Sequence, residues 1–386
     1  MTRQCHIVNL QTGLGGAEVY TMFFARAVRA AGCRTVLHVH PHAGFWRHLG
    51  QWAIEIAPVT VDVDLLRGLQ RGAWLVTHAP ISGEFAAIAK QQHWLTGFCH
   101  MPLSGRTAGA LADYDQVYAV SAHVLSTLAP MGVKNAYQEP LYGIAEFERG
   151  AAGATGATDE GGVIRRRLEY SWDRRKFRDR VLEMCAPAVA ALLPHPEFTP
   201  RPGVTLGVVS NIGPIKQFDA LFSLIAPHLA RRPQVNLEIF GDGGYRSVRD
   251  LKRALAPLGG RARFWGMQSA PQAIYPKLDF LLSGLPEKEA LGLNIIEAQI
   301  CGTPVLAVDA PPFTETVADR ETGYLYPDPR QDAGSGFARV LDHALAAPRL
   351  KPLDARAHLE GFSRKAFDAR IARLVAHAMA AKGDHG

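Results

Sequence analysis

The sequence predicts an α/β protein made of two doubly wound, Rossmann-like domains. A chain of 386 residues is too long for one ordinary hydrophobic core and indicates about two domains. Short apolar runs alternate with helix-like stretches in both halves, which is typical of parallel sheets covered by helices. A proline-rich stretch at residues 194–202 interrupts the alternation, which restarts at Val204.

An apolar strand, a glycine turn and a helix open the first half. The helix is expected over residues 17–31, because Val19, Phe23 and Ala27 share one of its faces and Gly32 is a typical end. The following apolar runs are short enough to be strands. Strands are expected over residues 5–10, 35–39, 74–77, 95–98 and 116–120.

The second half repeats the alternation. A helix is expected from near Gly292 to Gly302, followed by Pro304 and another strand. Ligands of open parallel sheets bind at the carboxyl ends of the strands, so we expect the site in the cleft between the two halves. Strands are expected over residues 204–209, 236–240, 262–265, 280–282 and 305–308, and helices over residues 218–230 and 247–258.

Changes of composition suggest the domain boundaries. The first domain is expected over residues 1–200, including a basic helical insertion at about 150–195 whose start is rich in glycine and alanine. The second domain is expected over residues 201–355. Residues 356–386 carry an amphipathic helix, expected over 363–382, with apolar side chains at helical spacing.

The composition is that of a globular cytosolic protein. Hydrophobic residues make up 47% and charged residues 20% of the chain, and no apolar run approaches the ~20 residues that span a bilayer. The N-terminus has the pattern of a first strand and not of a signal peptide. Five scattered cysteines without a CxxC pair are expected to be reduced and mostly buried thiols.

The net charge of +6 is concentrated between the two halves, in Arg165–Arg167 and residues 174–180. A basic patch attracts nucleic acid, anionic lipid or acidic substrates, or is simply a solvated helix face. No nucleic-acid-binding motif accompanies it, so nucleic acid is not an expected partner. We expect this basic region to contact the inner face of a membrane peripherally.

Two glutamates lie eight positions apart around the start of the helix near Gly292. Glu289 follows the apolar run 280–282, and Glu297 lies on the helix. The free amides and positive dipole at this helix start, from Gly292, Leu293 and Asn294, suit a diphosphate. Glu297 can accept hydrogen bonds from the two vicinal hydroxyls of a ribose, and Glu289 from those of a sugar. The segment therefore predicts a nucleotide-sugar site.

This segment resembles the E-x7-E signature of retaining glycosyltransferases of family 4, the group 1 glycosyltransferases, which have the GT-B architecture. The runs Gly302-Thr303-Pro304-Val305 and Glu321–Pro327 resemble the same family. The resemblance implies two facing Rossmann-like domains with an interdomain cleft, and a C-terminal helix that crosses back to the first domain. It also implies transfer of a hexosyl group with retention at the anomeric carbon.

The resemblance extends to positions outside this segment. Gly15 and Gly16 resemble a GGAE segment in which glycines let the backbone approach donor phosphate and acceptor. His100, at the end of a strand, resembles a histidine that contacts the donor sugar, and His78 on the neighbouring strand is a weaker candidate. The backbone of Met267 lies at the position that is near the nucleobase in the family.

One position departs from the family pattern. The family carries an arginine five residues before a lysine, and both neutralise the diphosphate. Lys216 matches the lysine, whereas Asn211 occupies the arginine position. A neutral amide can donate a hydrogen bond to phosphate but cannot offset its charge. Either another cation such as Lys288 compensates, or donor binding is weaker or altered.

The expected reaction is transfer of a sugar from a UDP- or GDP-linked donor to a hydroxyl of a glycan or glycolipid. Glu289, Lys216 and His100 are the expected catalytic residues, with Lys216 stabilising charge on the departing diphosphate. No tightly bound cofactor is expected. Alternation of His38, His40 and His42 would place three imidazoles on one strand face, but no carboxylate accompanies them and no metal is expected in this fold.

Two other functions stay open. A sugar phosphorylase or nucleotide-sugar epimerase would keep the fold and change the reaction. A non-catalytic nucleotide-sugar-binding subunit would explain why Asn211 replaces the arginine. Phosphate-dependent turnover, or epimerisation without an acceptor, would identify the first group, and binding without turnover would identify the second.

Overall fold

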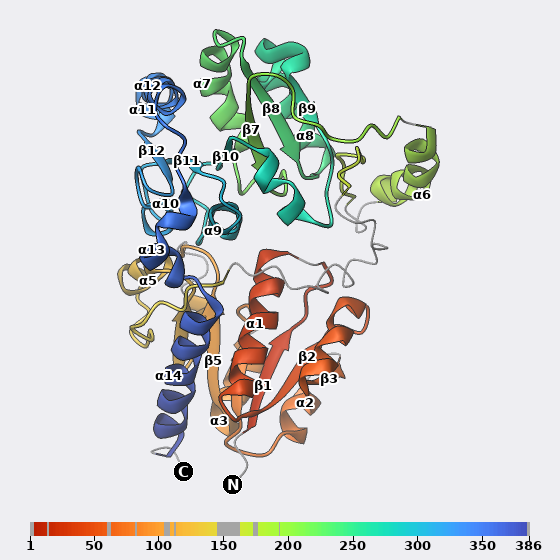
Figure 1. Ribbon diagram of the computed structural model, residues 1–386. Helices are drawn as coiled ribbons and strands as arrows, with labels where there is room; N and C mark the ends of the chain where they lie inside the picture. The colour runs from red at the N-terminus through yellow and green to blue at the C-terminus, as the bar shows by residue number, and fades with distance from the viewer. Residues whose placement is uncertain are drawn as a thin grey trace. The chain divides into compact units, whose positions relative to one another are not determined.

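A computed structural model describes the protein over residues 4–13, 15–59, 63–81, 83–103, 109–111, 113–144, 163–172, 177–192 and 194–383. The chain divides into two compact units (Figure 1). The first unit comprises Met1–Glu146 and Glu360–Gly386, and the second comprises Phe147–Leu359. Each unit is built around its own parallel sheet. The α/β class expected from the alternating pattern is therefore confirmed.

The first unit has a six-stranded sheet in the order β3-β2-β1-β4-β5-β6, with parallel pairing throughout. The strand order changes direction between β1 and β4. Ligands of doubly wound sheets bind at the carboxyl ends of the strands at this kind of switch point. The strands are β1 (Gln4–Asn9), β2 (Arg34–Val39), β3 (Glu55–Pro58), β4 (Trp74–Thr77), β5 (Trp94–Cys99) and β6 (Gln116–Ala119).

The second unit repeats the same strand order. Its sheet runs β12-β11-β10-β7-β8-β9, again parallel, so its switch point lies between β7 and β10. Most of the residues expected to bind the donor follow these two strands. The strands are β7 (Val204–Val209), β8 (Val235–Phe240), β9 (Ala262–Phe264), β10 (Phe280–Leu282), β11 (Val305–Val308) and β12 (Gly323–Tyr326).

Helices connect the strands. In the first unit they are α1 (Gly16–Ala30), α2 (Val63–Gly68), α3 (Gly83–Gln92), α5 (Ala122–Leu128) and the C-terminal α14 (Arg364–Gly383), with short 3-10 helices at Gly44–Trp52 and Ala129–Met131. In the second unit the α-helices are α6 (Phe177–Leu192), α7 (Phe218–Ala230), α8 (Tyr245–Ala254), α9 (Leu293–Ile300), α10 (Phe313–Thr316), α11 (Pro329–Asp332), α12 (Ser335–Ala346) and α13 (Arg356–Glu360). Its 3-10 turns are Ala256–Arg261, Pro271–Ala273, Tyr275–Lys277 and Pro352–Asp354. Among the described residues, none of the helices combines the length and apolar character that a bilayer crossing requires.

The C-terminal helix α14 packs on α1 within the first unit. Phe367 meets the ring of Tyr20 edge-on, with ring centroids 5.7 Å apart. Arg373 forms an ion pair with Glu139, and His377 lies 2.9 Å from the side-chain nitrogen of Gln116. The apolar spacing seen in the sequence is thus the buried stripe that returns the end of the chain to the first sheet.

The stretch before residue 200 belongs to the second unit, which corrects the expected boundary. The amide of Arg167 donates to the carbonyl of Trp265 over 2.9 Å, and that of Ser171 to Gly243 over 2.9 Å. Ile164 and Phe198 are buried in the second core. These contacts attach residues 163–172 and 194–198 to the sheet that follows them. The glycine- and alanine-rich start of the expected insertion lies outside the described residues.

A pair of buried histidines joins the first two strands. Nδ1 of His6 lies 3.0 Å from Nε2 of His38, and both side chains are almost fully buried. Burial, aided for His6 by the neighbouring His38, lowers the pKa of each histidine to about 4. His93, Arg34 and Glu55 are the other charged or titratable groups that act on this pair. His38 is therefore a structural partner of His6, and no metal-binding group of three His, Cys, Asp or Glu residues is found in the described ranges.

The histidine pair predicts acid sensitivity of the first unit. Above pH 6.5 both histidines are neutral whether folded or unfolded, so they contribute no pH dependence. Between pH 6.5 and about 4 only the unfolded chain takes up these protons. The free energy of unfolding therefore decreases as the pH is lowered, and it levels off below the pKa of the folded state. The expected slope approaches roughly 1.4 kcal/mol per pH unit for each histidine.

Urea unfolding between pH 7.5 and 4 measures this slope, compared with a His38→Gln variant. We expect the slope of the variant to be clearly smaller, because one titrating group is gone. His343→Gln, which removes an exposed histidine of the second unit, is the matched control and should leave the slope unchanged. An equal slope in wild type and His38→Gln would contradict the prediction.

Candidate functional site

An ion pair joins the two loops at the switch point of the second sheet. Lys216 lies in the loop between β7 and α7, and Glu289 lies in the loop between β10 and α9. Nζ of Lys216 donates to Oε2 of Glu289, and both side chains are mostly buried. The structure therefore brings together two of the three residues expected to act in catalysis.

The other oxygen of Glu289 accepts backbone hydrogen bonds from its own loop. The amides of Ala290 and Gly292 lie 3.3 and 3.2 Å from Oε1. The sequence predicted that the amide of Gly292 would bind phosphate; in the structure this amide donates to Glu289 instead, so phosphate binding there stays a prediction. A flexible loop carboxylate three residues upstream is close enough to cap the helix start, as a capping side chain does. The amides of Leu293 and Asn294 have no acceptor within the described residues.

Backbone geometry at Gly292 makes this arrangement depend on glycine. Gly292 has φ of 80°, in the left-handed region, and a Cβ there would lie 3.0 Å from Cδ1 of Ile295. Two residues later, Nδ2 of Asn294 donates to the carbonyl of Val209 over 3.1 Å, which ties the start of α9 to the end of β7. Helix α9 thus begins directly at the switch point.

The second glutamate of the motif is held by a tyrosine. The hydroxyl of Tyr275 donates to Oε2 of Glu297 over 2.6 Å, and Tyr275 itself is fully buried. Burial raises the pKa of Glu297, and the hydrogen bond from Tyr275 opposes part of that rise. Oγ1 of Thr303, from the Gly-Thr-Pro run, donates to the carbonyl of Tyr275 over 2.5 Å. Glu297 is therefore oriented by a chain of buried partners.

Tyr275 is a site residue that the sequence analysis missed. It lies in a short 3-10 turn, Tyr275–Lys277, outside the Glu289–Glu297 motif and 22 residues before Glu297. No local pattern marks it as functional. Its hydroxyl needs a buried acceptor, and only the folded structure shows that this acceptor is Glu297.

The remaining candidates of the second unit lie at its surface. Asn211 is exposed, and its side chain makes no hydrogen bond to the described residues. Lys288 is also exposed, and no contact links it to Glu289 among the residues described. Met267 follows β9 with 44% of its surface exposed. Lys216 is therefore the cation that the structure places at the switch point.

A polar network follows the first strands of the first unit. Oε2 of Glu18 accepts the amide of Gly15 over 3.0 Å, and Oε1 lies 3.2 Å from Nε2 of His78. Nδ1 of His78 is 2.8 Å from Oγ1 of Thr21. Burial alone would raise the pKa of Glu18, but the hydrogen bonds from His78 and Gly15 hold it below its usual value. The network fixes the glycine turn against the end of β4, and Gly16 itself is exposed.

His100 lies beside this network at the end of β5. Its ring centroid is 4.5 Å from that of His78, and it also contacts the rings of Tyr20 and Phe98. Burial lowers its pKa well below the ordinary value. Nε2 of His100 is inaccessible to solvent and has no hydrogen-bond partner in the described structure. A ligand would reach this nitrogen only if the side chains that cover it moved.

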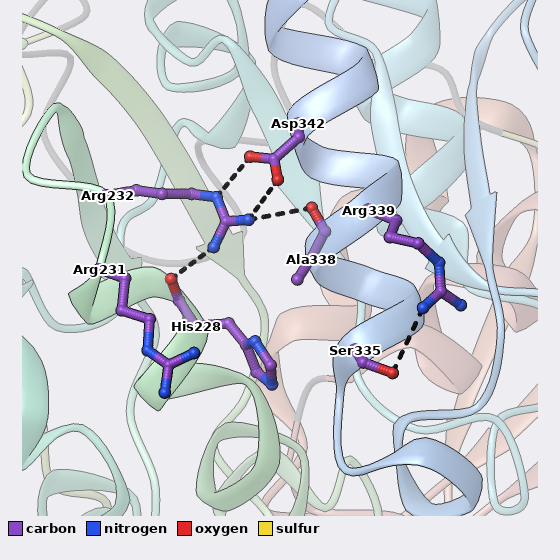
Figure 2. Close-up of a pocket in the computed structure, with 7 residues that line it drawn as sticks. All are labelled: His228, Arg231, Arg232, Ser335, Ala338, Arg339 and Asp342. Atoms are coloured by element: carbon purple, nitrogen blue, oxygen red, sulfur yellow. Dashed lines mark hydrogen bonds and ion pairs between the residues drawn. The ribbon is translucent and has the colours of Figure 1, made fainter.

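A separate basin lies between α7 and α12 of the second unit (Figure 2). It has a volume of about 490 Å³. Arg232 donates to both oxygens of Asp342 and to the carbonyls of His228 and Ala338, so its guanidinium holds the two helices together. The hydrogen bonds of Arg232 are thus used within the protein, and none of the residues expected to bind the donor line the basin. The residues that line it are His228, Arg231, Arg232, Ser335, Ala338, Arg339 and Asp342.

Comparison with known proteins identifies the family of the segment that contains the loops after β7 and β10. Residues 203–344 match the family described as glycosyl transferases group 1. These residues form a group 1 glycosyltransferase domain. The match includes β7 to β12, Lys216 and both glutamates of the E-x7-E motif. The resemblance found in the sequence is confirmed.

Curated relatives align with less than half of the chain. A D-inositol 3-phosphate glycosyltransferase of Gordonia bronchialis is 34% identical over 173 residues, which is 40% of this chain. An alpha-monoglucosyldiacylglycerol synthase of Streptococcus pneumoniae is 29% identical over 171 residues, or 43% of this chain. The aligned stretches span only 36% and 37% of the lengths of these two relatives.

Solved structures extend the likeness to the whole fold. HepE of Anabaena, solved in complex with UDP and glucose, has a TM-score of 0.67 at 16% identity. That likeness covers 97% of this chain and 100% of HepE. Sucrose-phosphate synthase of Thermosynechococcus elongatus has the same TM-score and identity, covering 98% and 100% of the two chains. The glycosyltransferase domain and its companion unit thus have the GT-B fold of these proteins.

The contact between Tyr275 and Glu297 leads to a binding prediction. Tyr275→Phe removes the hydrogen bond that orients Glu297 and opposes its protonation. We expect binding of a nucleoside diphosphate to weaken about tenfold or more, since hydrogen bonds to charged groups contribute roughly 1.5–3 kcal/mol. The loss should grow as the pH is lowered, because the pKa of Glu297 rises further in the variant.

Calorimetry with the preferred nucleotide and its 2′,3′-dideoxy analogue measures this effect. The analogue lacks the hydroxyls from which Glu297 is expected to accept hydrogen bonds. Wild type and Tyr275→Phe should therefore bind the analogue with equal affinity. Tyr324→Phe changes a tyrosine on β12 in the same way and is the matched control. Equal weakening for both ligands would contradict a role in ribose recognition.

Proposed function

We propose that this protein is a retaining glycosyltransferase that moves a sugar from a nucleoside-diphosphate sugar to a hydroxyl acceptor. The observation that carries this proposal is the joint placement of Lys216, Glu289 and the start of α9 at one switch point. A cation, a carboxylate and helix-start amides are the groups that bind a diphosphate and an adjoining sugar. The group 1 glycosyltransferase domain supports the same assignment.

In this proposal the second unit binds the donor. Lys216 and the amides of Leu293 and Asn294 bind the diphosphate, and Glu297 accepts the ribose hydroxyls. Glu289 positions the donor sugar, and the backbone of Met267 lies near the base. UDP-linked sugars are the first donors to test, because HepE was solved with UDP and glucose.

Transfer would break the bond between the anomeric carbon and the diphosphate and form a bond to the acceptor oxygen on the same face. The acceptor proton passes to the departing phosphate oxygen. Lys216 and the helix-start amides stabilise the charge that builds on that phosphate, which is commonly the largest catalytic contribution. Gly16 and His100 of the first unit are proposed to approach the acceptor and donor sugar.

The first experiment is a calorimetric panel of UDP, GDP, ADP and CMP with wild type, Glu297→Ala and Glu321→Ala. We expect one diphosphate to bind tightly and to lose about tenfold or more in affinity in Glu297→Ala, because two hydroxyl contacts disappear. Glu321 is an exposed glutamate of the same domain outside these contacts, so its variant should bind like wild type.

Turnover of the matching nucleotide sugars then tests the reaction. Release of nucleoside diphosphate that depends on a hydroxyl acceptor, with the anomeric configuration retained, supports the proposal. Phosphate-dependent turnover would identify a phosphorylase, and interconversion of sugars without an acceptor an epimerase. Tight binding without any turnover would favour the non-catalytic subunit, the alternative that Asn211 motivates.

The position of Asn211 leads to a gain-of-affinity prediction. Asn211→Arg places a cation on the exposed loop after β7, where the family carries one. We expect the affinity for the nucleoside diphosphate to rise by about fivefold to tenfold at low salt, because charge-assisted contacts to phosphate are stronger than neutral ones. The gain should shrink at high salt.

Affinity for the corresponding nucleoside, which has no phosphate, separates a charge effect from a structural one. Asn211→Arg should leave nucleoside binding unchanged. The matched control is Gln234→Arg, which adds the same charge at an exposed position just before β8. An unchanged diphosphate affinity in Asn211→Arg would show that this position does not face the phosphates.

The acceptor and the cellular location complete the proposal. We place the acceptor among the hydroxyls of glycolipid or cell-surface polysaccharide intermediates, and the protein in the cytoplasm at the inner face of the membrane. The relative that is a synthase of a glucosyldiacylglycerol supports a lipid-linked acceptor. Product analysis with lipid and soluble acceptors tests this choice.

A further inference from the structure

Helix α6 presents its largest apolar side chains to solvent. Phe177 is 74% exposed, Val181 44% and Met184 81%. Their spacing of four and three residues places them on one face of the helix. Phe177 and Met184 are the most exposed large apolar side chains among the described residues. Burying this stripe against another surface would remove it from water.

The face of α6 opposite the stripe includes its least exposed residues. Asp179 is buried, and Glu183 and Ala186, four and seven residues later, are half-buried. The acidic residues of the described half of the helix thus lie away from the apolar stripe. An approaching anionic surface would meet the stripe without meeting Asp179 or Glu183 first.

Arginines border the apolar stripe on both sides. Arg178 and Arg180 precede Val181 and are exposed, and helical geometry puts them on opposite edges of the stripe. The guanidinium of Arg178 also donates to Oδ1 of Asp179, over 3.1 and 3.0 Å. The guanidinium of Arg180 lies over the ring of Phe177, 5.7 Å from its centroid. Residues 163–180 contain eight arginines and lysines and three acidic residues, in a chain with a net charge of +6. Eight basic and three acidic residues give this segment a net charge of +5, close to the net charge of +6 of the whole chain.

We propose that α6 is an interfacial helix that docks this protein on an anionic lipid bilayer. An apolar stripe bordered by basic side chains is the arrangement of helices that lie in the headgroup region, with apolar groups in the acyl boundary and arginines at the phosphates. A narrow stripe with arginines on both edges matches a flat anionic surface better than an apolar protein groove. Nucleic acid would leave the stripe exposed to water.

This docking is independent of sugar transfer, so the two proposals can fail separately. Vesicle flotation with phosphatidylcholine alone and with added phosphatidylglycerol, at low and high salt, measures it without any substrate. We expect wild type to bind the anionic vesicles at low salt and to be released at high salt. Absence of binding to anionic vesicles at low salt, or equal binding to neutral vesicles, would overturn the proposal.

Variants locate the docking surface. Phe177→Ser with Met184→Ser, and separately Arg178→Gln with Arg180→Gln, should each lower vesicle binding by about tenfold. Leu353→Ser, at an exposed leucine outside α6, and Arg246→Gln with Arg249→Gln on α8 are the matched controls and should bind like wild type. Unchanged binding of both α6 variants would overturn the proposal. Thermal unfolding and nucleotide binding verify that each variant folds.

Cys185 allows the same test in a protein with no substitution on α6. It follows Met184, is exposed, and is the accessible thiol among cysteines that are otherwise buried or half-buried. An environment-sensitive fluorophore on Cys185 should shift to the blue with anionic vesicles and be quenched by lipids that carry a quencher in the acyl chain. Cys185→Ser measures background labelling of Cys301. A fluorophore that stays in water while the protein floats with vesicles would show that another surface docks.

Discussion

The proposed donor site depends on the interactions of one carboxylate, that of Glu289. One oxygen pairs with Lys216 and the other accepts the amides of Ala290 and Gly292, so a single anion connects the loop after β7 with the loop before α9. These partners are a cation and helix-start amides, the groups that bind phosphate oxygens in other proteins. Glu289 therefore occupies, within the protein itself, an environment suited to an anion.

This arrangement shapes how a donor can bind. A diphosphate has to share Lys216 with Glu289 or move Glu289 aside, while the amides of Leu293 and Asn294 are available without rearrangement. Glu297 needs no rearrangement either, because Tyr275 and Thr303 already hold it in place. The proposed ribose subsite is thus preorganised, whereas in the proposed phosphate subsite Lys216 and the amide of Gly292 are already bound to Glu289. Preorganised hydrogen-bond partners cost less ordering free energy on binding than groups that must rearrange.

Local pattern was sufficient for the central strands and for the backbone of the site. The buried strands Val204–Val209, Phe280–Leu282 and Val305–Val308 were predicted to the residue, because each is a short apolar run bounded by turns. The strands at two sheet edges were missed: β3 is short, half-exposed and ends at Pro58, and β12 was interpreted only as a family motif. The capping of Gly292 by Glu289 and the bond from Tyr275 to Glu297 depend on how loops meet in the fold, which spacing along the chain does not reveal.

The charges of the two loops explain why Asn211 matters for the proposed binding of a diphosphate. Lys216 and Glu289 offset each other, so the phosphate subsite formed by these two loops carries no net charge. An arginine at position 211 would leave one positive charge for the donor, whereas Asn211 leaves only amide dipoles of α9. The remaining attraction for a diphosphate must then come from displacement of Glu289, which frees Lys216, or from groups outside these loops. In the first case the proposed donor binding is coupled to movement of Glu289, because the sugar that Glu289 is proposed to contact arrives with the phosphate that displaces it.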